Sequence, residues 1–347
     1  MSESVLNLFS NSLDASQTLY LRNNLASTGS VPFKGPLGQC PDIIQSSEPV
    51  ANAQNVFSTV SSWEQAYNAQ PVAAVPNYYY LRGMNGGSDN DANAFSLYYA
   101  PAQVFLLPAT FKGNALCTVS GHESTPVSAP AGHIGVGEEP FVWTPPALPP
   151  DSYFNLIAQV SANALVATIP SVSDWLDLAK LIGQTPTFGI RTQTPVTATQ
   201  WIRRQRLTVP ANFSTSPITI TLFASGLQGT RVSLLCDTLT SQQVPVLLGP
   251  LTLGGDGMQT GATFTLPAGY SANLAVQFWN PDNQKVEAGA SLSVTFSYPI
   301  NPGAELERAI AENLVNLHHY DALGDQGVSA IKPKAMAVVS QMTFTVV

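Results

Sequence analysis

Glycine and proline interrupt the chain along its whole length. Its 347 residues include 25 glycines and 27 prolines, a density that divides the chain into short elements and favours many short strands over long helices. Apolar residues make up 44% of the chain, which is enough to build packed cores. Because a single core stops growing beyond about 250 to 300 residues, we expect two domains.

Charged residues are scarce and mostly acidic. They make up 10% of the chain, against roughly 25% in a typical soluble domain. The formal net charge of -8 leaves no basic surface to neutralise phosphates, so we expect no nucleic-acid partner. Polar residues, glycine and proline break every apolar run before the roughly 18 residues of a spanning helix, so we also expect no transmembrane segment.

The N-terminal residues and the cysteines bear on where the protein is made. The sequence MSESVLNLFS has an acid and no Lys or Arg before its first apolar residues, which differs from a classical secretory signal. Cys40, Cys117 and Cys236 are far apart and odd in number, so we expect three buried thiols in a reducing compartment. These features predict synthesis in the cytoplasm without a classical signal peptide, with release or assembly outside the cell left open.

A first β-sandwich domain is predicted over residues 71–195. A strand at 77–82 and a returning strand at 94–99 flank a polar turn, and further strands are expected at 104–107, 116–119, 140–144 and 153–160. One helix, 171–182, is predicted to begin at a capping-box-like Ser171 and Asp174 and to end at Gly183. The preceding segment, 1–70, is expected to hold two β-like runs at 5–9 and 18–22, a connector, and helical turns within 55–67.

A second β-sandwich domain is predicted over residues 196–300, followed by a tail over 301–347. About seven short strands in about 100 residues match an immunoglobulin-like sandwich, and the alternation in 218–222 and 292–298 indicates strands with one buried face. In the tail, Asn301 is expected to cap a helix with Pro302 in its first turn, and a strand is expected from 335 to 347. The predicted fold class is therefore mainly β, with two immunoglobulin-like β-sandwich domains, a short helix in the first, and a C-terminal helix plus strand.

The first domain resembles the tandem immunoglobulin-like modules of bacterial surface and secreted proteins. The resemblance covers about residues 71–195 and lies in the strand 77–82 that ends in Arg82, the following Asn85, Trp143, and the helix leading to Gly189-Ile-Arg191. Those modules carry an aromatic residue, Arg and Asn where this chain has Ile190, Arg191 and Thr192. The resemblance implies a non-catalytic module that spaces, binds or assembles, and it names no ligand.

Two groups of residues are candidates for binding. Tyr79 and Tyr98 lie in runs of tyrosine where alternation predicts at least one outward ring per run, suited to a sugar or a protein interface; pairing across strands is the alternative. Arg203, Arg204 and Arg206 form the basic concentration of the chain, with Arg204 and Arg206 on one face of a strand. They are suited to an acidic neighbouring subunit or an anionic head group, or they guard an edge strand.

Signals for catalysis and metal binding are weak. The sequence contains neither a G-x-S-x-G nucleophile motif nor a Gly-Lys-Ser/Thr phosphate loop. The turn at 89–93 copies the first half of a calcium loop, but alanines stand where the loop needs Gly and Glu, so a polar turn is the favoured interpretation. His122, Glu123, His133, Glu138 and Glu139 match no zinc spacing. We therefore predict no enzyme, no cofactor and no metal.

Two function classes follow from this sequence. The first is a non-enzymatic interaction or assembly protein, a homo-oligomer whose weakly charged, Ser/Thr-rich β-sandwich modules self-associate. The alternative is a secreted effector, toxin component or adhesin that binds a host glycan or membrane surface. Residues 83–190 carry a formal charge of -6 and precede the arginines of 203–206, so a salt-sensitive, head-to-tail contact between the two is also predicted.

Overall fold

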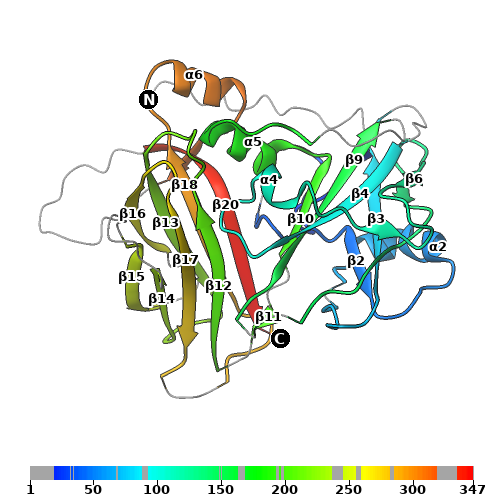
Figure 1. The fold of residues 1–347 in the computed structure, drawn as a ribbon, viewed down its shortest axis with the longest axis horizontal. Helices are drawn as coiled ribbons and strands as arrows, with labels where there is room; N and C mark the ends of the chain where they lie inside the picture. The colour runs from blue at the N-terminus through cyan, green and yellow to red at the C-terminus, as the bar shows by residue number, and fades with distance from the viewer. Residues whose placement is uncertain are drawn as a thin grey trace, which may run out of the picture.

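The chain folds into four β-sheets arranged as two units (Figure 1). The computed structural model describes residues 19–31, 33, 35–67, 69–87, 93–147, 149, 151–162, 169–192, 195–196, 199–236, 245–254, 259–281, 285–318 and 334–346. The prediction of a mainly β protein is confirmed within these residues, because strands far outnumber helices. The β-like run expected at 5–9 and most of the 89–93 turn lie outside them.

The first unit packs two sheets face to face. Sheet 1 contains β1 (Leu19–Tyr20), β2 (Ile43–Ser46), β3 (Asn77–Asn85), β5 (Cys117–Thr118), β7 (Ile134–Val136) and β8 (Phe141–Trp143). Sheet 2 contains β4 (Asn93–Pro101), β6 (Thr125–Val127), β9 (Phe154–Ala162) and β10 (Phe188–Thr192). Leu81 and Phe141 of sheet 1 share one buried cluster with Phe95 and Leu156 of sheet 2.

The predicted hairpin between strands 77–82 and 94–99 is wrong. Both strands form, as β3 and β4, but β3 pairs with β1, β2, β7 and β8, whereas β4 pairs with β6 and β9. The chain thus crosses from one sheet to the other between them. The physical reason is that both strands bury apolar side chains, so facing each other across the core removes more surface from water than lying side by side.

The second unit also consists of two sheets. Sheet 3 contains β11 (Pro195–Val196), β13 (Ser216–Ser225), β16 (Gln259–Leu266), β18 (Ser291–Pro299), β19 (Asn316–His318) and β20 (Lys334–Val346). Sheet 4 contains β12 (Gln200–Thr208), β14 (Arg231–Cys236), β15 (Leu247–Thr252) and β17 (Ser271–Trp279). The last strand, β20, lies inside sheet 3, between β11 and β18.

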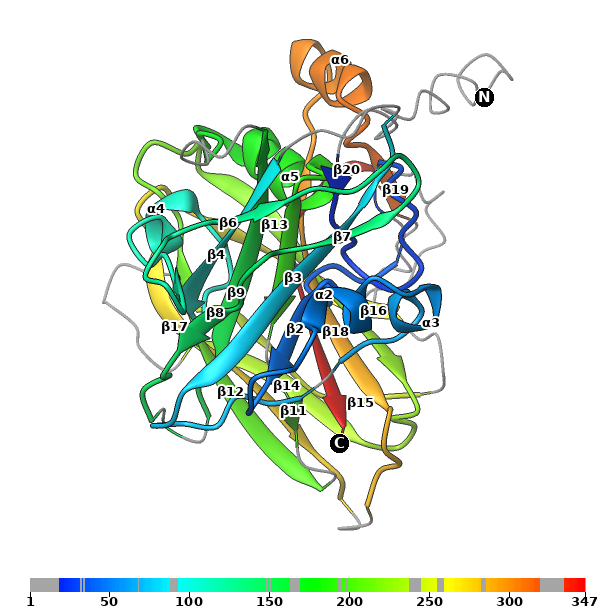
Figure 2. The ribbon, with the colours of Figure 1, turned by 90° about the vertical axis from the view of Figure 1, so that its right-hand side faces the viewer.

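Five short helices are described between the strands: α2 (Ala53–Phe57), α3 (Val60–Trp63), α4 (Pro108–Phe111), α5 (Trp175–Gln184) and α6 (Ala304–Ala311). Figure 2 shows α2 and α3 on the outer side of sheet 1, where Phe57 packs against Ile44 and Tyr80. None of the helices in the described ranges is long and apolar enough to cross a membrane.

Three local predictions need correction. Helix α5 begins at Trp175, four residues later than expected, because Asp174 is its cap and accepts a hydrogen bond from the backbone of Asp177 at 2.8 Å; it also continues through Gly183 to Gln184. Helix α6 follows Gly303 rather than Asn301, because the positive φ of 97° at this cap suits glycine. The strand expected at 104–107 is an irregular segment that leads into α4.

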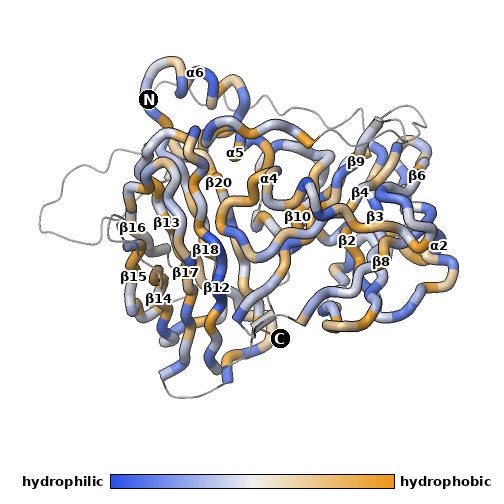
Figure 3. Tube along the Cα trace, in the orientation of Figure 1, coloured by the Kyte–Doolittle hydropathy of each residue, from blue (hydrophilic) through white to orange (hydrophobic). Residues whose placement is uncertain are grey.

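Alternating hydropathy places one face of each second-unit strand inside, as Figure 3 shows along the chain. In β13, Ile218, Ile220 and Leu222 are buried, and they share one cluster with Leu274 and Val276 of β17 in sheet 4. The residues between them, mostly Ser and Thr, point out of the sandwich. The alternation is as expected, but the expectation of a single buried face is wrong for β13 and β18, because Thr219, Thr221, Ser293 and Thr295 are buried as well.

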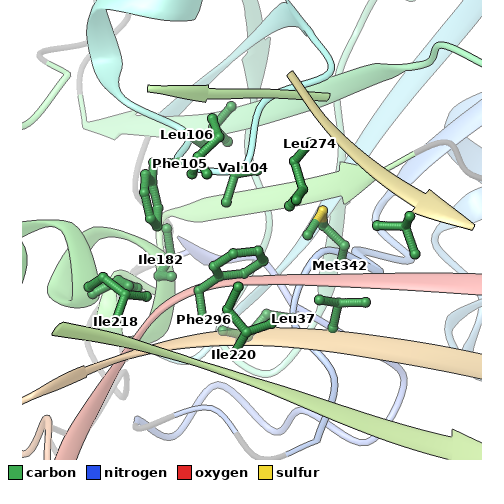
Figure 4. Close-up of a cluster of buried hydrophobic side chains, with 14 of the residues drawn as sticks. Leu37, Val104, Phe105, Leu106, Ile182, Ile218, Ile220, Leu274, Phe296 and Met342 are labelled. Atoms are coloured by element: carbon green, nitrogen blue, oxygen red, sulfur yellow. The ribbon is translucent and has the colours of Figure 1, made fainter. Parts of the chain in front are cut away.

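A common core joins the two units. Phe105, from the segment after β4, lies 5.1 Å from the ring of Trp175 in α5 and 5.8 Å from the ring of Phe296 in β18. Figure 4 shows this cluster, in which Ile182 of α5 and Met342 of β20 also take part. Helix α5 therefore packs at the seam between the units, instead of across the end of one sandwich.

Candidate interaction surface

Tyr79 and Tyr98, the two predicted aromatic binding residues, lie in the interior. Tyr79 is 0% exposed and Tyr98 is 7% exposed, so the expectation that these rings point outward is wrong. Tyr98 packs 5.8 Å from the ring of Phe111, and burial raises its pKa. Tyr79 of β3 lies in the core between sheets 1 and 2, whereas its neighbour Tyr80 is covered by Phe57 of α2, so both faces of β3 are covered. Tyr98 of β4 is covered by the cluster that contains Phe111 and Ile157.

Arg203, Arg204 and Arg206 lie on β12 with the predicted alternation. Arg204 and Arg206 share one face of the strand, and Arg203 is half-buried, where loss of hydration lowers its pKa. Arg204 forms an ion pair with Asp151. Arg206 donates hydrogen bonds to Ser271 Oγ at 2.5 Å and to Asn273 Oδ1 at 3.3 Å.

The outer edge of β12 is occupied by the first unit. The backbone N–H of Arg206 donates to Ala102 O at 2.9 Å, and the N–H of Val104 donates back to Arg206 O at 2.8 Å. The backbone N–H of Arg204 donates to Asp151 O at 2.7 Å. The contact between an acidic first unit and the arginine strand is thus made within one chain, and these arginines hold the two units together.

The metal candidates do not assemble. Among the described residues, no three His, Cys, Asp or Glu side chains lie close enough to hold a metal ion. Ser120 Oγ donates to Glu139 Oε1 at 2.8 Å, and this hydrogen bond holds the pKa of the exposed Glu139 below its usual value. His133 instead lies with Nδ1 2.9 Å from its neighbour Ala131 O.

A buried charge centre, missed from the sequence, lies beneath the outer layer of sheet 1. Asp42 is fully buried, and its Oδ1 lies 2.5 Å from Arg22 Nη2 and 3.1 Å from Arg82 Nε. The guanidinium carbon of Arg22 stands 3.3 Å from the centre of the Trp63 ring. These residues are 20 and 40 positions apart, so nothing in the spacing signals the cluster.

The donors of this charge centre are used within the protein. Arg82 Nη1 donates to both Ser62 O and Ser62 Oγ at 2.7 Å, and Arg82 Nη2 donates to Gln65 O at 3.0 Å. Arg22 Nη1 donates to Trp63 O at 2.7 Å. Burial lowers the pKa of Arg82, opposed by the charge of Asp42. The centre therefore fastens α3 and the following loop to sheet 1, and we assign it a structural role.

Cys40 and Cys236 are buried free thiols, whereas Cys117 is exposed. Loss of hydration raises the pKa of Cys40 to about 12, with a smaller contribution from the charge of Asp42. The expectation of three buried thiols is thus wrong for Cys117. This cysteine lies in the short strand β5 at the margin of sheet 1.

The outward side of sheet 3 is almost free of charge. Its strands β13, β16 and β18 contain no Asp, Glu, Lys or Arg, and β20 contains only Lys334 at its first position. We call the outward residues of these strands the charge-free face; they are Thr219, Thr221, Phe223, Thr263, Thr265, Ser293, Thr295, Gln341, Thr343 and Thr345. The Ser/Thr alternation is visible in the sequence, but its gathering on one face by four strands is a property of the sheet.

Side chains on the charge-free face bond to one another. The hydroxyl oxygens of Thr219 and Thr263 lie 2.9 Å apart across β13 and β16, and Ser293 and Thr343 make the same contact across β18 and β20. Most of the face is covered within the chain: Thr219, Thr221, Ser293, Thr295 and Thr343 are buried, and the backbone N–H of Leu37 donates to Gln341 Oε1 at 2.5 Å. Toward β16 it is open, with Phe223 41% exposed and Thr263 and Thr265 exposed.

Two edge strands flank this open side. Strand β15 ends sheet 4 and β16 ends sheet 3, and both lie on the side away from the first unit (Figure 1). Strand β15 contains Pro250, and its pairing with β14 shifts register between Val232 and Leu234. Strand β16 pairs with β13 over eight residues and contains neither proline nor charge.

A cavity lies beside β20 on the same face of sheet 3, since Gln341 lines it. It has a volume of about 380 Å³ and lies between the end of α5, the segment around Leu37, and β20, with Ala179, Gln184, Leu314 and Val338 in its wall. Gln184 donates to Asn313 O there. This lining offers hydrogen-bonding amides and apolar groups but no acid, base or nucleophile for a reaction.

Comparison with known proteins places the chain in no family. No family model and no curated protein matches it. Remote likenesses to solved structures include the secreted serine protease VesC from Vibrio cholerae, with 11% identity, 65% of this chain and 48% of that chain covered, and a TM-score of 0.21. The chain thus spans about half the length of that protease.

Bacterial adhesins give similar values. The collagen adhesin (CNA) from S. aureus is 8% identical, with coverage of 79% of this chain and 88% of that chain and a TM-score of 0.20. CfaE, the adhesive subunit of the CFA/I fimbria of enterotoxigenic Escherichia coli, is 10% identical, with coverage of 97% and 94% and a TM-score of 0.18. Scores this low carry no argument about fold or function, which therefore has to come from the molecule itself.

Proposed function

We propose that this is a non-enzymatic interaction and assembly protein that self-associates through the open part of the charge-free face of sheet 3, at Phe223 and β16. The observation that carries this proposal is the absence of charge from β13, β16 and β18 in a chain whose net charge is -8. Copies of an acidic protein repel each other over most of their surface, and they can approach where charge is missing. Interface cores are likewise depleted of charged residues.

Two finer predictions are consistent with an assembly protein, and a third observation weakens the alternative function. The paired sheets of each unit are consistent with immunoglobulin-like sandwiches, which commonly serve as binding or spacing modules. Two buried thiols and one exposed thiol, with no disulfide among them, are consistent with synthesis in a reducing compartment. A glycan- or membrane-binding role loses its residues, because Tyr79 is buried and Arg204 is paired with Asp151.

Size-exclusion chromatography with light scattering tests self-association. The full chain is expected to give a mass above the monomer that falls on dilution. Phe223→Glu places a charge on the charge-free face and is expected to weaken association at least about tenfold, since like charges then oppose each other. Val119→Glu is the matched control, because Val119 is also exposed, at 57%, but belongs to the first unit. A clean monomer at high concentration contradicts the proposal, as does equal weakening by both variants.

A further inference from the structure

We infer that two copies of the chain pair antiparallel through the outer edge of β16, centred on Thr263, so that their two copies of sheet 3 become one continuous sheet. This inference rests on the proposed self-association and specifies its geometry. The partner is a second copy of this chain, related by a two-fold axis normal to the sheet.

The first argument is the state of the β16 edge. One side of β16 bonds to β13 from Gln259 to Leu266, and none of the residues that the structure describes pairs with the other side. An edge strand presents a row of backbone N–H and C=O groups, and another strand matches their spacing. The chemistry that this edge recognises is therefore an extended backbone.

The second argument is that β16 lacks the protection seen at other edges of the second unit. The edge of β12 is bonded to the segment Ala102–Val104 of the same chain. The edge of β15 contains Pro250, which has no N–H to donate, and a shifted register that disrupts regular pairing. Eight uncharged residues without proline make β16 the described edge best suited to pairing.

The third argument is the fit of β16 to itself. Its pairing with β13 places Ala262 and Phe264 on the inner face and Thr263 on the outer face. In an antiparallel pair centred on Thr263, each Ala262 stands opposite the partner copy's Phe264, so a small side chain meets a large one. Both inner side chains are half-buried in the single chain, and this pairing removes them further from water.

The outer face and the charges agree with this register. Thr263 stands opposite its own copy, a threonine pair that is favourable across antiparallel strands, and Gly261 stands opposite Thr265. No like charges meet, although each copy carries a net charge of -8. Specific interfaces bury about 1,200–2,000 Å² in total. A pair of short strands lies at or below the low end of that range, so we expect a dimer that dissociates on dilution.

Disulfide trapping tests the register. In a Cys117→Ser background, which removes the exposed native thiol, Thr263→Cys brings two sulfurs together, because Cβ atoms of directly opposed residues lie about 4.5–5.5 Å apart. Mild oxidation is expected to give a covalent dimer on a non-reducing gel. Thr265→Cys is the matched control, since it is exposed on the same strand and face but stands opposite Gly261, and at least about fivefold less dimer is expected.

A charge variant gives an independent measurement. Thr263→Lys places two lysines opposite each other and is expected to weaken the dimer at least about tenfold in light scattering, with an unchanged far-ultraviolet circular dichroism spectrum. If the unmodified chain associates but Thr263→Cys gives no more covalent dimer than Thr265→Cys, the β16 pairing is overturned while self-association stands. If the unmodified chain is monomeric, both are overturned.

Discussion

At the scale of single residues, the strongest constraint is the charge centre of Asp42, Arg22 and Arg82. All three side chains are buried, and each guanidinium is fixed by the carboxylate and by backbone carbonyl groups. Removing one partner of a buried ion pair leaves a charge that is neither hydrated nor compensated. The charge centre therefore attaches α3 and the loop after it to sheet 1, through the carbonyl groups of Ser62, Trp63 and Gln65.

Asp42→Asn is expected to lower the free energy of unfolding by about 3–5 kcal/mol, because both arginines lose their counter-charge in the interior. Urea denaturation followed by circular dichroism measures the change. Asp151→Asn is the control, since its pair with Arg204 is partly exposed to solvent, with the two side chains 27% and 42% exposed, and is expected to contribute less than about 1 kcal/mol. Similar losses in the two variants contradict the assignment of the Asp42 cluster as a stabilising centre.

At the scale of elements, alternation in the sequence predicts the long strands of the second unit well. The alternating runs 218–222 and 292–298 fall within β13 and β18, which extend them by one to three residues at each end. Their polar faces are short Ser and Thr side chains, so the periodicity is unambiguous. Alternation does not predict which strands pair, because it indicates which face of a strand is buried but not what covers that face. That is why β3 and β4 were expected to pair.

The close approach of β16 to β13 gives a prediction at this scale. A Cβ atom at Gly261 would stand 2.4 Å from Ile220 O, so Gly261→Ala forces the two backbones apart. We expect a loss of about 1–3 kcal/mol in the free energy of unfolding and faster amide exchange in β16. Gly113→Ala serves as control, because a Cβ there meets nothing within 4 Å. Unchanged exchange in β16 contradicts this interpretation.

At the scale of the whole molecule, the two units form one packed body. Phe105 of the first unit lies against Phe296 of the second, and Tyr153 donates a hydrogen bond to Gln205 Oε1 at 2.5 Å. The pKa of Tyr153 is raised because its hydroxyl is fully buried at this seam. Extensive apolar contact between units favours cooperative behaviour rather than independent domain motion.

We therefore expect one transition in differential scanning calorimetry, with equal calorimetric and van't Hoff enthalpies. Phe105→Ala removes the ring shared by Trp175 and Phe296 and is expected to destabilise the protein by about 3–5 kcal/mol, because it opens a cavity in the common core. It is also expected to broaden or split the transition. Two well-separated transitions in the unmodified protein contradict a common core.

The sequence by itself determined the class of structure and the character of its surface. The density of Gly and Pro, the period-two alternation and the scarcity of charge required short strands with apolar inner and Ser/Thr outer faces. These are local properties, readable within a few residues.

Only the tertiary structure decided which strands share a sheet, which strands are covered on both faces, and which sheet edge is left without a paired strand among the described residues. Tyr79 is buried because its side chain lies in the core between sheets 1 and 2, and Asp42 meets Arg82 across 40 residues. Strand β16 is the last strand of its sheet, whereas β20, from the end of the chain, lies between β11 and β18. Such contacts depend on chain crossings between distant segments, which no local period encodes.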